Sequence, residues 1–452
     1  MTLSAKPAPD GLPWMALLSL LLTVFLGSLD QSIANTALPA IAAALQRTPA
    51  ESVWVIHAYQ LAVVAVLLPM AALGDHWGAR KVFLGGVALF SLGALASASA
   101  SQLEWLAVFR ALQGVGSAGV VSVNLALIQK IFPPEKLGRG AGFNALIVGM
   151  GFSLGPTVAS LLLAVLPWPW LFGLQAPLGL VGWWLARRHL PRTEATHAGQ
   201  PFDRGLALLS AVCFASLVFT LSAVAQQKSA QLVLGSLALM LGSGAWLLHR
   251  QRGHAAPVLP VDLMRRPLFS LSVFTAFSSF ATQGLAFVAL PFFFQHELGR
   301  SPLETGVLMS VWALAVAMLA PVAGSLSDRH PPAILGGLGL GLLSLGMAGL
   351  AAIGPEVPFA TVSLCMALCG LGFGLFQSPN LRAIMSSAPS HRAAGASGMV
   401  ALARLTGQAS GAALVALCFN LFGALGAGRA VLLGAVTAGL GALFSIARLW
   451  SR

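Results

Sequence analysis

Long apolar segments recur along the whole sequence, and they restrict its possible folds more than any other feature. Each is close to the ~20 residues that an α-helix needs to cross the hydrocarbon core of a bilayer. Only 8% of the 452 residues are charged, whereas about 25% is usual in a soluble protein. No strands of alternating polarity recur, which argues against a β-barrel, and a helix satisfies its own backbone hydrogen bonds in lipid. The sequence therefore predicts an all-α integral membrane protein.

Fourteen of these segments can be delimited, and we expect each to be one transmembrane helix. The predicted spans are residues 14–36, 53–73, 82–100, 104–127, 140–165, 169–186, 205–225, 231–249, 268–294, 303–325, 333–353, 358–381, 395–422 and 429–447. An even number of crossings places both ends of the chain on the same side of the membrane.

The distribution of Lys and Arg predicts which side that is, because cytoplasmic loops of membrane proteins carry an excess of both. With the N-terminus inside, nineteen of the 25 basic residues fall in inner segments. Arg110 and Arg404 fall within spans, and the outer loops hold only Arg47, Lys228, Arg300 and Arg429. Both termini are therefore expected in the cytoplasm, with the chain in a cell membrane of the bacterial inner-membrane type. Topology accounts for the formal charge of +12, so no nucleic-acid partner is expected.

The sequence contains no pattern typical of an enzyme or of a metal site. It has no HExxH motif, no nucleotide-binding loop and no Ser/His/Asp cluster at membrane depth. Cys213, Cys365, Cys369 and Cys418 all fall inside predicted helices, where cysteines usually pack as small apolar residues. We therefore expect no disulfide, no metal and no cofactor, with the proton gradient as the energy source.

Two predicted cytoplasmic segments repeat one another and indicate a duplicated architecture. PMAALGDHWGARKVFLGGVALFSLG begins at Pro69, and PVAGSLSDRHPPAILGGLGLGLLSLG begins at Pro321. Matching loops at matching places predict a six-helix bundle at residues 1–190 and another at 261–452. Residues 191–260 would be a linker that carries two inserted transmembrane helices. Parallel repeats of this kind place a substrate site between the halves in major-facilitator transporters.

Short motifs along nearly the whole chain resemble one group of these transporters. They are LDQSIANTALP at 29–39, WVIHAYQLA at 54–62, the loop around Asp75, RALQGVGSAG at 110–119, GFSLGPTVAS at 151–160, WPWLFGLQAPLG at 168–179 and ARLTGQASGAAL at 403–414. In this order and spacing they are similar to the fourteen-helix drug:proton antiporter subfamily of the major facilitators, the EmrB/QacA type. Some positions depart from its pattern: His57 stands where Thr or Ser is usual, and His76 stands in place of an Arg.

Asp30 is the only acidic residue that falls well inside a predicted span. Placing a charged group in the hydrocarbon core costs free energy, so a charged residue there is a candidate functional residue. From its position along the first helix, Asp30 should lie level with Arg110 and His57. Asp30 would then be a proton carrier that loads from outside and releases to the cytoplasm, with Arg110 as its counter-charge. The alternative is a fixed Asp–Arg pair that only staples two helices together.

Polar residues at helical spacing predict a water-filled cavity beside this group. Gln113 and Asn124 share one stripe of their helix with Arg110. Arg404 has no acidic residue expected near it, so its partner would be either backbone carbonyls or an anionic group of the substrate. The full set of candidates for the cavity or substrate site is Gln31, Asn35, Tyr59, Gln60, Gln113, Asn124 and Arg404.

A second group of residues is expected to control opening and closing. Gly151 and Gly155 form a small-xxx-small pair that allows close helix contact, and Pro156 bends the helix that carries them. Ordinary tight packing is the alternative role for this motif. The family resemblance also implies a cytoplasmic latch, with Asp75 in the short turn before the third helix. The latch candidates are Asp75, His76, Gly78, Arg80 and Lys81 in the first half and Asp328 and Arg329 in the second.

These features predict a proton-coupled transporter that exports lipophilic compounds. A cationic cargo would have Asp30 as its only visible counter-charge within the membrane. The alternatives are an exporter of one endogenous metabolite and a membrane receptor that keeps the fold without transporting. The lipid bilayer is the one certain partner, and nothing in the sequence indicates a periplasmic adaptor.

The topology can be tested with a tag fused after Arg452. We expect the tag to be labelled only after intact cells are permeabilised, because nineteen basic residues favour the inner side. A tag accessible from outside intact cells would contradict the predicted orientation.

Overall fold

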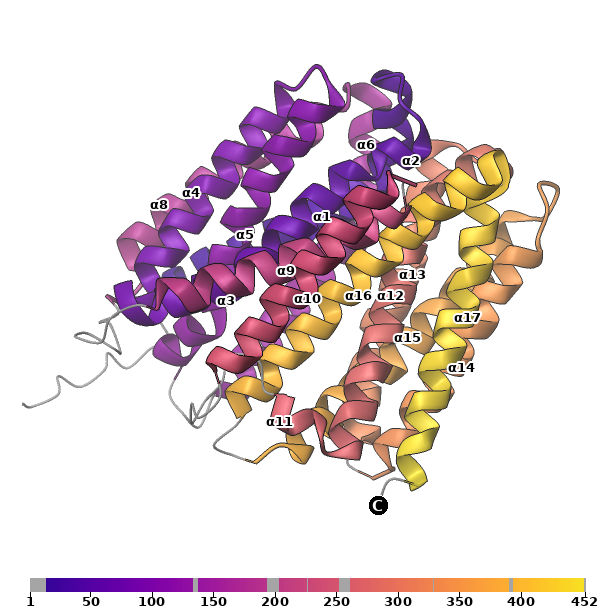
Figure 1. Cartoon of the computed structure of the whole chain (residues 1–452). Coiled ribbons are helices and arrows are strands. Elements are labelled where there is room, and N and C mark those ends of the chain that lie inside the picture. Colours follow the sequence, from indigo (N-terminus) through magenta and orange to yellow (C-terminus); the bar gives the residue numbers. More distant parts are fainter. Residues whose placement is uncertain are drawn as a thin grey trace, which may run out of the picture.

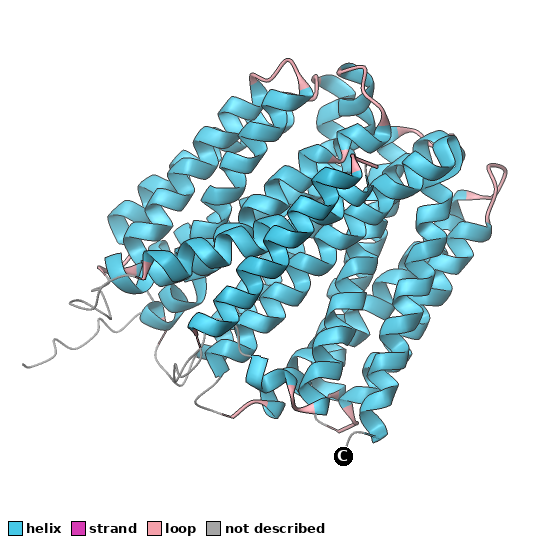
Figure 2. Cartoon of the chain, viewed as in Figure 1, coloured by secondary structure: helices cyan, strands magenta, loops and turns pink. Residues whose placement is uncertain are grey.

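The computed structural model describes residues 14–132, 137–192, 203–225, 227–251, 261–327, 329–389 and 393–450. Within these ranges every regular element is a helix, in agreement with the expected all-α class (Figure 2). The longer helices are α1 (Trp14–Ala44), α3 (Trp54–Trp77), α4 (Ala79–Ala98), α5 (Leu103–Ile131), α6 (Leu137–Val165), α8 (Gln175–His189), α9 (Arg204–Ala225), α10 (Ala230–Arg250), α12 (Pro267–Phe292), α13 (Pro302–Leu326), α14 (Pro332–Ala352), α15 (Phe359–Ser387), α16 (Ala393–Phe422) and α17 (Gly426–Ala447). The short ones are α2 (Pro49–Ser52), α7 (Trp170–Gly173), α11 (Val261–Met264), η2 (Phe293–Glu297), η4 (Gly423–Leu425) and η5 (Arg448–Trp450).

Twelve segments of the described chain are long and apolar enough to cross a membrane, whereas the sequence predicted fourteen. One of the twelve, Gly398–Trp450, extends over 53 residues and contains both α16 and α17, which only the 3₁₀ turn η4 separates. The other difference lies at 169–186, which was expected to be one continuous helix. There the chain forms α7 and then α8, and α8 has only 15 residues. By length and apolar composition, the described helices therefore give twelve candidate spans and not the fourteen that were predicted.

The helices pack in two groups (Figure 1). In the first group α5 packs between α3 and α4, and α1 packs against α6 and α8. In the second group α15 packs in the same way between α13 and α14, and α12 packs against α16 and α17. The repeated arrangement of α3–α5 and α13–α15 gives the α3–α4 and α13–α14 connections equivalent places in the chain.

The α9–α10 hairpin lies against both groups. α9 packs on α3 of the first group and on α16 of the second, whereas α10 packs on α9. Phe219 of α9 contacts Trp54 with 6.5 Å between ring centres. Near the end of α9, the amide of Asn420 donates to the carbonyl oxygen of Ala225 at 2.9 Å. The hairpin therefore covers one seam between the two groups.

The opposite seam is closed by α6 and α13 near the end of the bundle where α6 finishes and α13 begins. We call this the distal end. There Thr157 and Ser310 share a hydrogen bond of 2.6 Å, and Ser310 also donates to the carbonyl oxygen of Ser153 at 3.1 Å. A Cβ atom on Gly306 would lie only 2.7 Å from the carbonyl oxygen of Pro156, so α13 approaches α6 closely. The two groups are thus in contact at the distal end of this seam.

A double-cysteine variant tests this contact. With Cys213, Cys365, Cys369 and Cys418 replaced by Ser, we expect Thr157→Cys with Ser310→Cys to form a disulfide under mild oxidation, because the two hydroxyl oxygens are 2.6 Å apart. Mass spectrometry of the linked peptides would detect it. Thr157→Cys with Ser325→Cys, which moves the second thiol to the far end of α13, is the matched control. Equal cross-linking of both pairs would contradict this geometry.

Candidate functional site

Asp30 and Arg110 form an ion pair in the interior of the first helix group. Nη1 of Arg110 lies 2.7 Å from Oδ1 and 2.8 Å from Oδ2 of Asp30. The side chain of Asp30 is 0% exposed and that of Arg110 is 1% exposed. Asp30 belongs to α1 and Arg110 to α5, so the pair joins two helices. The structure brings together the two residues that the depth argument had placed at one level.

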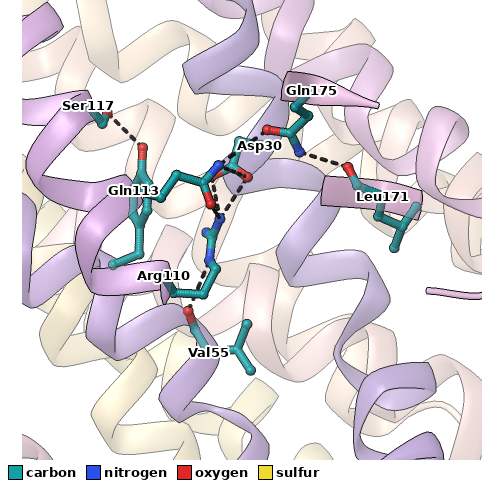
Figure 3. Close-up of polar contacts among 8 residues, drawn as sticks. Asp30, Val55, Arg110, Gln113, Ser117, Leu171 and Gln175 are labelled. Atoms are coloured by element: carbon teal, nitrogen blue, oxygen red, sulfur yellow. Dashed lines mark hydrogen bonds and ion pairs between the residues drawn. The ribbon is translucent and has the colours of Figure 1, made fainter. Parts of the chain in front are cut away.

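Two glutamines extend the pair into a network (Figure 3). Gln113 accepts a hydrogen bond from Arg110 at 2.7 Å and donates one to Oδ1 of Asp30 at 3.0 Å. Gln113 also donates to Gln175 of α8 at 3.4 Å, and Gln175 donates to the carbonyl oxygen of Leu171 at 2.9 Å. Both carboxylate oxygens of Asp30 therefore have donors, as a buried charge requires.

Aromatic rings enclose the guanidinium group of Arg110. Its central carbon lies 4.5 Å from the ring centre of Tyr59 and 5.0 Å from that of Phe172, within the range of cation–π attraction. Nε of Arg110 donates to the carbonyl oxygen of Val55 at 3.4 Å. The hydroxyl of Tyr59 donates to Ser117 at 2.7 Å, which fixes the ring against α5. Arg110 is therefore held by α3 and by the α7–α8 region as well as by Asp30.

Close helix contacts bring these side chains together. A Cβ atom on Gly114, one turn after Arg110, would lie 2.5 Å from the carbonyl oxygen of Tyr59, so α5 and α3 touch there. A Cβ atom on Gly179 would lie 2.2 Å from Oγ of Ser91, so α8 approaches α4 in the same way. Small residues allow such approaches between membrane helices.

His57 is not part of the network. Its side chain is completely buried, and within the described residues neither ring nitrogen has a hydrogen-bond partner. The ring stands edge-on to Trp54 with 6.1 Å between ring centres. Tyr59, which faces Arg110, follows two residues later, and side chains two positions apart on a helix point in roughly opposite directions. The structure therefore does not join His57 to the Asp30–Arg110 pair.

The other polar candidates in the first group are spread over several helices. Asn35 and Gln60 are buried, and their side-chain oxygens have no hydrogen-bond partner among the described residues. Gln31 is partly exposed. Asn124 donates to Asn144 of α6 at 2.7 Å, so it joins α5 to α6 and not to α1.

Arg404 lies in the middle of α16 and is partly exposed. It takes part in none of the hydrogen bonds, ion pairs or ring contacts found among the residues that the structure describes. The sequence left two possible partners for Arg404, backbone carbonyls and an anionic group of the substrate. Among the described residues, Arg404 makes no hydrogen bond to a backbone carbonyl.

Comparison with known proteins identifies the family. Residues 20–412 match the Major Facilitator Superfamily. The chain belongs to the major facilitator superfamily. It is 43% identical over 444 residues to the protein named uncharacterized transporter YebQ of Escherichia coli strain K12, with 97% of each chain covered. It is 30% identical over 408 residues to the tetracenomycin C resistance and export protein of Streptomyces glaucescens, covering 90% of this chain and 76% of the relative.

Solved structures agree on the fold of this major facilitator. A bacterial homologue of the human lysosomal transporter Spinster, in an inward-facing and unoccupied conformation, matches with a TM-score of 0.72 over 98% of both chains. The identity of 14% makes this a likeness of fold alone. Family and fold together show a secondary transporter and not an enzyme, as the sequence predicted.

The GFSLGPTVAS motif of this major facilitator lies between α1 and α13. Cβ atoms on Gly151 and Gly155 would lie 2.7 Å from Cβ of Ser28 and 2.4 Å from Cβ of Ser32, so one face of α6 is pressed onto α1. The other face carries the contacts to α13 at the distal end, including the carbonyl oxygen of Pro156. Tight packing thus describes the glycine face, while the opposite face forms the contact between the two halves.

The loop motif differs from the expected latch. Asp75 lies in the last turn of α3 and not in the following turn, because the helix continues to Trp77. The turn itself is confined to Gly78, whose φ of 91° favours glycine. Arg80 donates to the carbonyl oxygen of Arg187 in α8.

The described residues do not test the predicted acid–base latch. Lys81 and Arg329 are exposed, and His76 is partly exposed. The side chain of Asp75 and the whole of Asp328 lie outside the described residues. The predicted acidic members of the latch therefore stay predictions.

Sequence reasoning missed Gln175 and Phe172 as neighbours of the ion pair. Both belong to WPWLFGLQAPLG, which counted above only among the motifs that resemble the transporter family. A glutamine in an otherwise apolar stretch was the available signal, since an amide in lipid needs a polar partner.

Arg448 was counted with the basic residues of the inner segments, and the sequence did not indicate that it is buried. Its side chain is buried, 3% exposed, since the turn η5 continues α17 and keeps the residue inside the bundle. Arg448 donates to Asn380 at 2.9 Å, to Ser272 at 3.2 Å and to the carbonyl oxygen of Ser445 at 3.1 Å. It therefore joins α12, α15 and α17 at the end of the bundle opposite the distal end.

The ion pair predicts an asymmetric response to mutation. Arg110→Ala leaves the buried carboxylate with only Gln113, so we expect the free energy of unfolding to fall by about 3–5 kcal/mol. Asp30→Asn should cost less, because Arg110 keeps Gln113, Val55 and two ring faces. The double variant should be more stable than Arg110→Ala alone, since the lone charge is gone. Thermal unfolding of the purified proteins measures this, and strictly additive losses would show that the two side chains are not coupled.

Proposed function

We propose that this chain is a proton-coupled exporter of lipophilic compounds that works by alternating access. The observation that carries the proposal is the completely buried Asp30–Arg110 pair. Among the acidic side chains that the structure describes, Asp30 is the one in the interior of a long apolar helix. An ionisable residue at such a position is a candidate for a proton relay.

A proton on Asp30 would alter the whole network around it. The neutral acid would no longer balance the charge of Arg110, and an uncompensated buried cation is strongly unfavourable. Asp30 lies on α1, which packs against α6 and α12, and α6 and α12 belong to different halves. A rearrangement at the pair can therefore reach the contact between the halves. Because Asp30 is 0% exposed, a change of conformation would open it to protons, which fits alternating access.

One relative is named as a tetracenomycin C resistance and export protein, which supports a role in export. The hypothesis of a cationic cargo paired with Asp30 is weakened, because both oxygens of Asp30 already accept hydrogen bonds from Arg110 or Gln113. An exporter of one metabolite would use the same machinery, and sensitivity of a deletion strain to many compounds or accumulation of one would separate the two. A receptor without transport would have little use for a buried pair and a tight contact between halves.

We further infer fourteen crossings, membership of the fourteen-helix drug:proton antiporter subfamily, and cytoplasmic termini in a cell membrane. The support is that α16 and α17 are separate helices, and that α7 and α8 together extend over 170–189. The positive-inside distribution supports the orientation.

The carrier role is tested by flux per folded molecule in reconstituted vesicles under an imposed pH gradient. We expect Asp30→Asn to fold and to lose at least about tenfold of the coupled flux, because the amide cannot carry a proton. Asp30→Glu should keep part of the activity, since an acid remains with its position shifted by one methylene. Asn124→Asp, an acid added where Asn124 faces α6, is a matched control that should not restore coupling to Asp30→Asn. Normal coupled flux in well-folded Asp30→Asn would favour the staple role instead.

A further inference from the structure

The two intramembrane arginines of this chain stand in opposite electrostatic situations. Arg110 has a carboxylate 2.7 Å away, whereas Arg404 takes part in no ion pair found in the described part of the chain. The other described acidic side chains, Glu51, Glu104, Asp203, Glu297, Glu304 and Glu356, lie at helix ends or in connections. The interior of the second half therefore carries a positive charge that no described carboxylate balances.

Arg404 lies inside the apolar part of α16, six residues after that apolar segment begins at Gly398. It follows the start of α16 at Ala393 by eleven residues, or ~17 Å of helix, and ~27 Å separate it from the other end at Phe422. An arginine side chain that reaches for lipid phosphates does so from the ends of a helix. Arg404 is not at either end of α16, which favours a partner inside the bundle.

The neighbours of Arg404 along α16 show the direction in which it points. Gly407 and Gly411 pack onto α12, where added Cβ atoms would lie 2.7 and 2.1 Å from backbone carbonyl oxygens. Leu405 and Ala409 lie in an apolar cluster with residues of α3. At 100° per residue, Arg404 falls on the arc between these two faces. The same cluster includes Phe214 and Val218 of α9, so Arg404 lies on the side of α16 between its contact with α12 and its contact with α3 and α9, near the boundary between the two groups.

Amide groups stand beside the same arc. Gln408, one turn after Arg404, donates to Gln283 of α12 at 2.9 Å. Gln283 is partly exposed, and within the described residues its amide nitrogen donates no hydrogen bond. A guanidinium group and a free amide N–H are donors that suit an oxyanion, and arginine matches carboxylate and phosphate groups in two-point contacts.

We propose that Arg404, supported by Gln283, binds an acidic group of the transported molecule, so that the cargo is a lipophilic organic acid in its anionic form. This inference rests on the proposed transport function and names its substrate class. The two intramembrane arginines would then have different partners. Arg110 pairs with Asp30, which remains the site for the proton, and Arg404 pairs with the anionic cargo.

The test is equilibrium binding of three labelled probes that share one ring system to the purified full-length chain, without a pH gradient. The probes are naphthalene-1-acetate, the neutral naphthalene-1-acetamide and the cationic 1-naphthylmethylammonium. We expect the acetate to bind about ten- to hundredfold more tightly than the acetamide, as a charge-assisted hydrogen bond predicts. Arg404→Gln should abolish this preference, Arg404→Lys should keep part of it, and Gln283→Leu should weaken it.

Ratios of acetate to acetamide are compared within each variant, so a loss of folded protein does not imitate the effect. Arg429→Gln, which removes an exposed arginine near the distal end, is the matched control and should leave the ratio unchanged. An equal ratio in wild type and Arg404→Gln, tighter binding of the ammonium probe, or no binding of the acetate would each overturn the proposal. Because no proton gradient is used, loss of coupled flux alone would count against the proposed exporter and not against this site.

Discussion

The cost of burying charge in a low-dielectric interior is the constraint on which this structure depends. An isolated carboxylate or guanidinium at this depth would be prohibitively unfavourable, and their mutual attraction offsets the loss of hydration only when the remaining donors and acceptors are also satisfied. Asp30 and Arg110 meet this condition with the help of Gln113, the carbonyl oxygen of Val55 and two aromatic rings. The same condition makes the pair sensitive to protonation, because one proton on Asp30 would disturb contacts with residues of four helices.

Depth in the membrane could be predicted from the sequence, whereas rotation about a helix axis could not. The constant rise of an α-helix and the fixed thickness of a bilayer placed Asp30 and Arg110 at one level, and they meet. The same count placed His57 at that level, but its direction around α3 depends on which face packs against α5. Close contact at Gly114 turns Tyr59 toward Arg110 and leaves His57 on another face.

Helix ends and breaks were harder still, because they depend on single residues and on neighbouring helices. The break between α7 and α8 and the continuation of α3 through Asp75 are examples, and both changed the surroundings of predicted site residues. Arg448 shows the same effect at the end of α17: the additional turn η5 places its side chain inside the bundle, where it contacts residues of three helices.

The two helix groups differ in their polar interiors. Arg110 of α5 pairs with an acid of α1, whereas Arg404 of α16 forms no ion pair among the described residues. This difference fits the proposed division between proton handling by the first group and cargo recognition by the second.

The position of the α9–α10 hairpin has a further consequence for how molecules arrive. With α9 lying on both α3 and α16, that flank of the transporter is shut off from the surrounding acyl chains. On the other flank α6 and α13 meet directly, and their contact at the distal end rests on small and hydroxyl-bearing residues. A movement that separates α6 from α13 would therefore open this flank, while α9 would keep the opposite flank covered, so molecules would gain access from one side only.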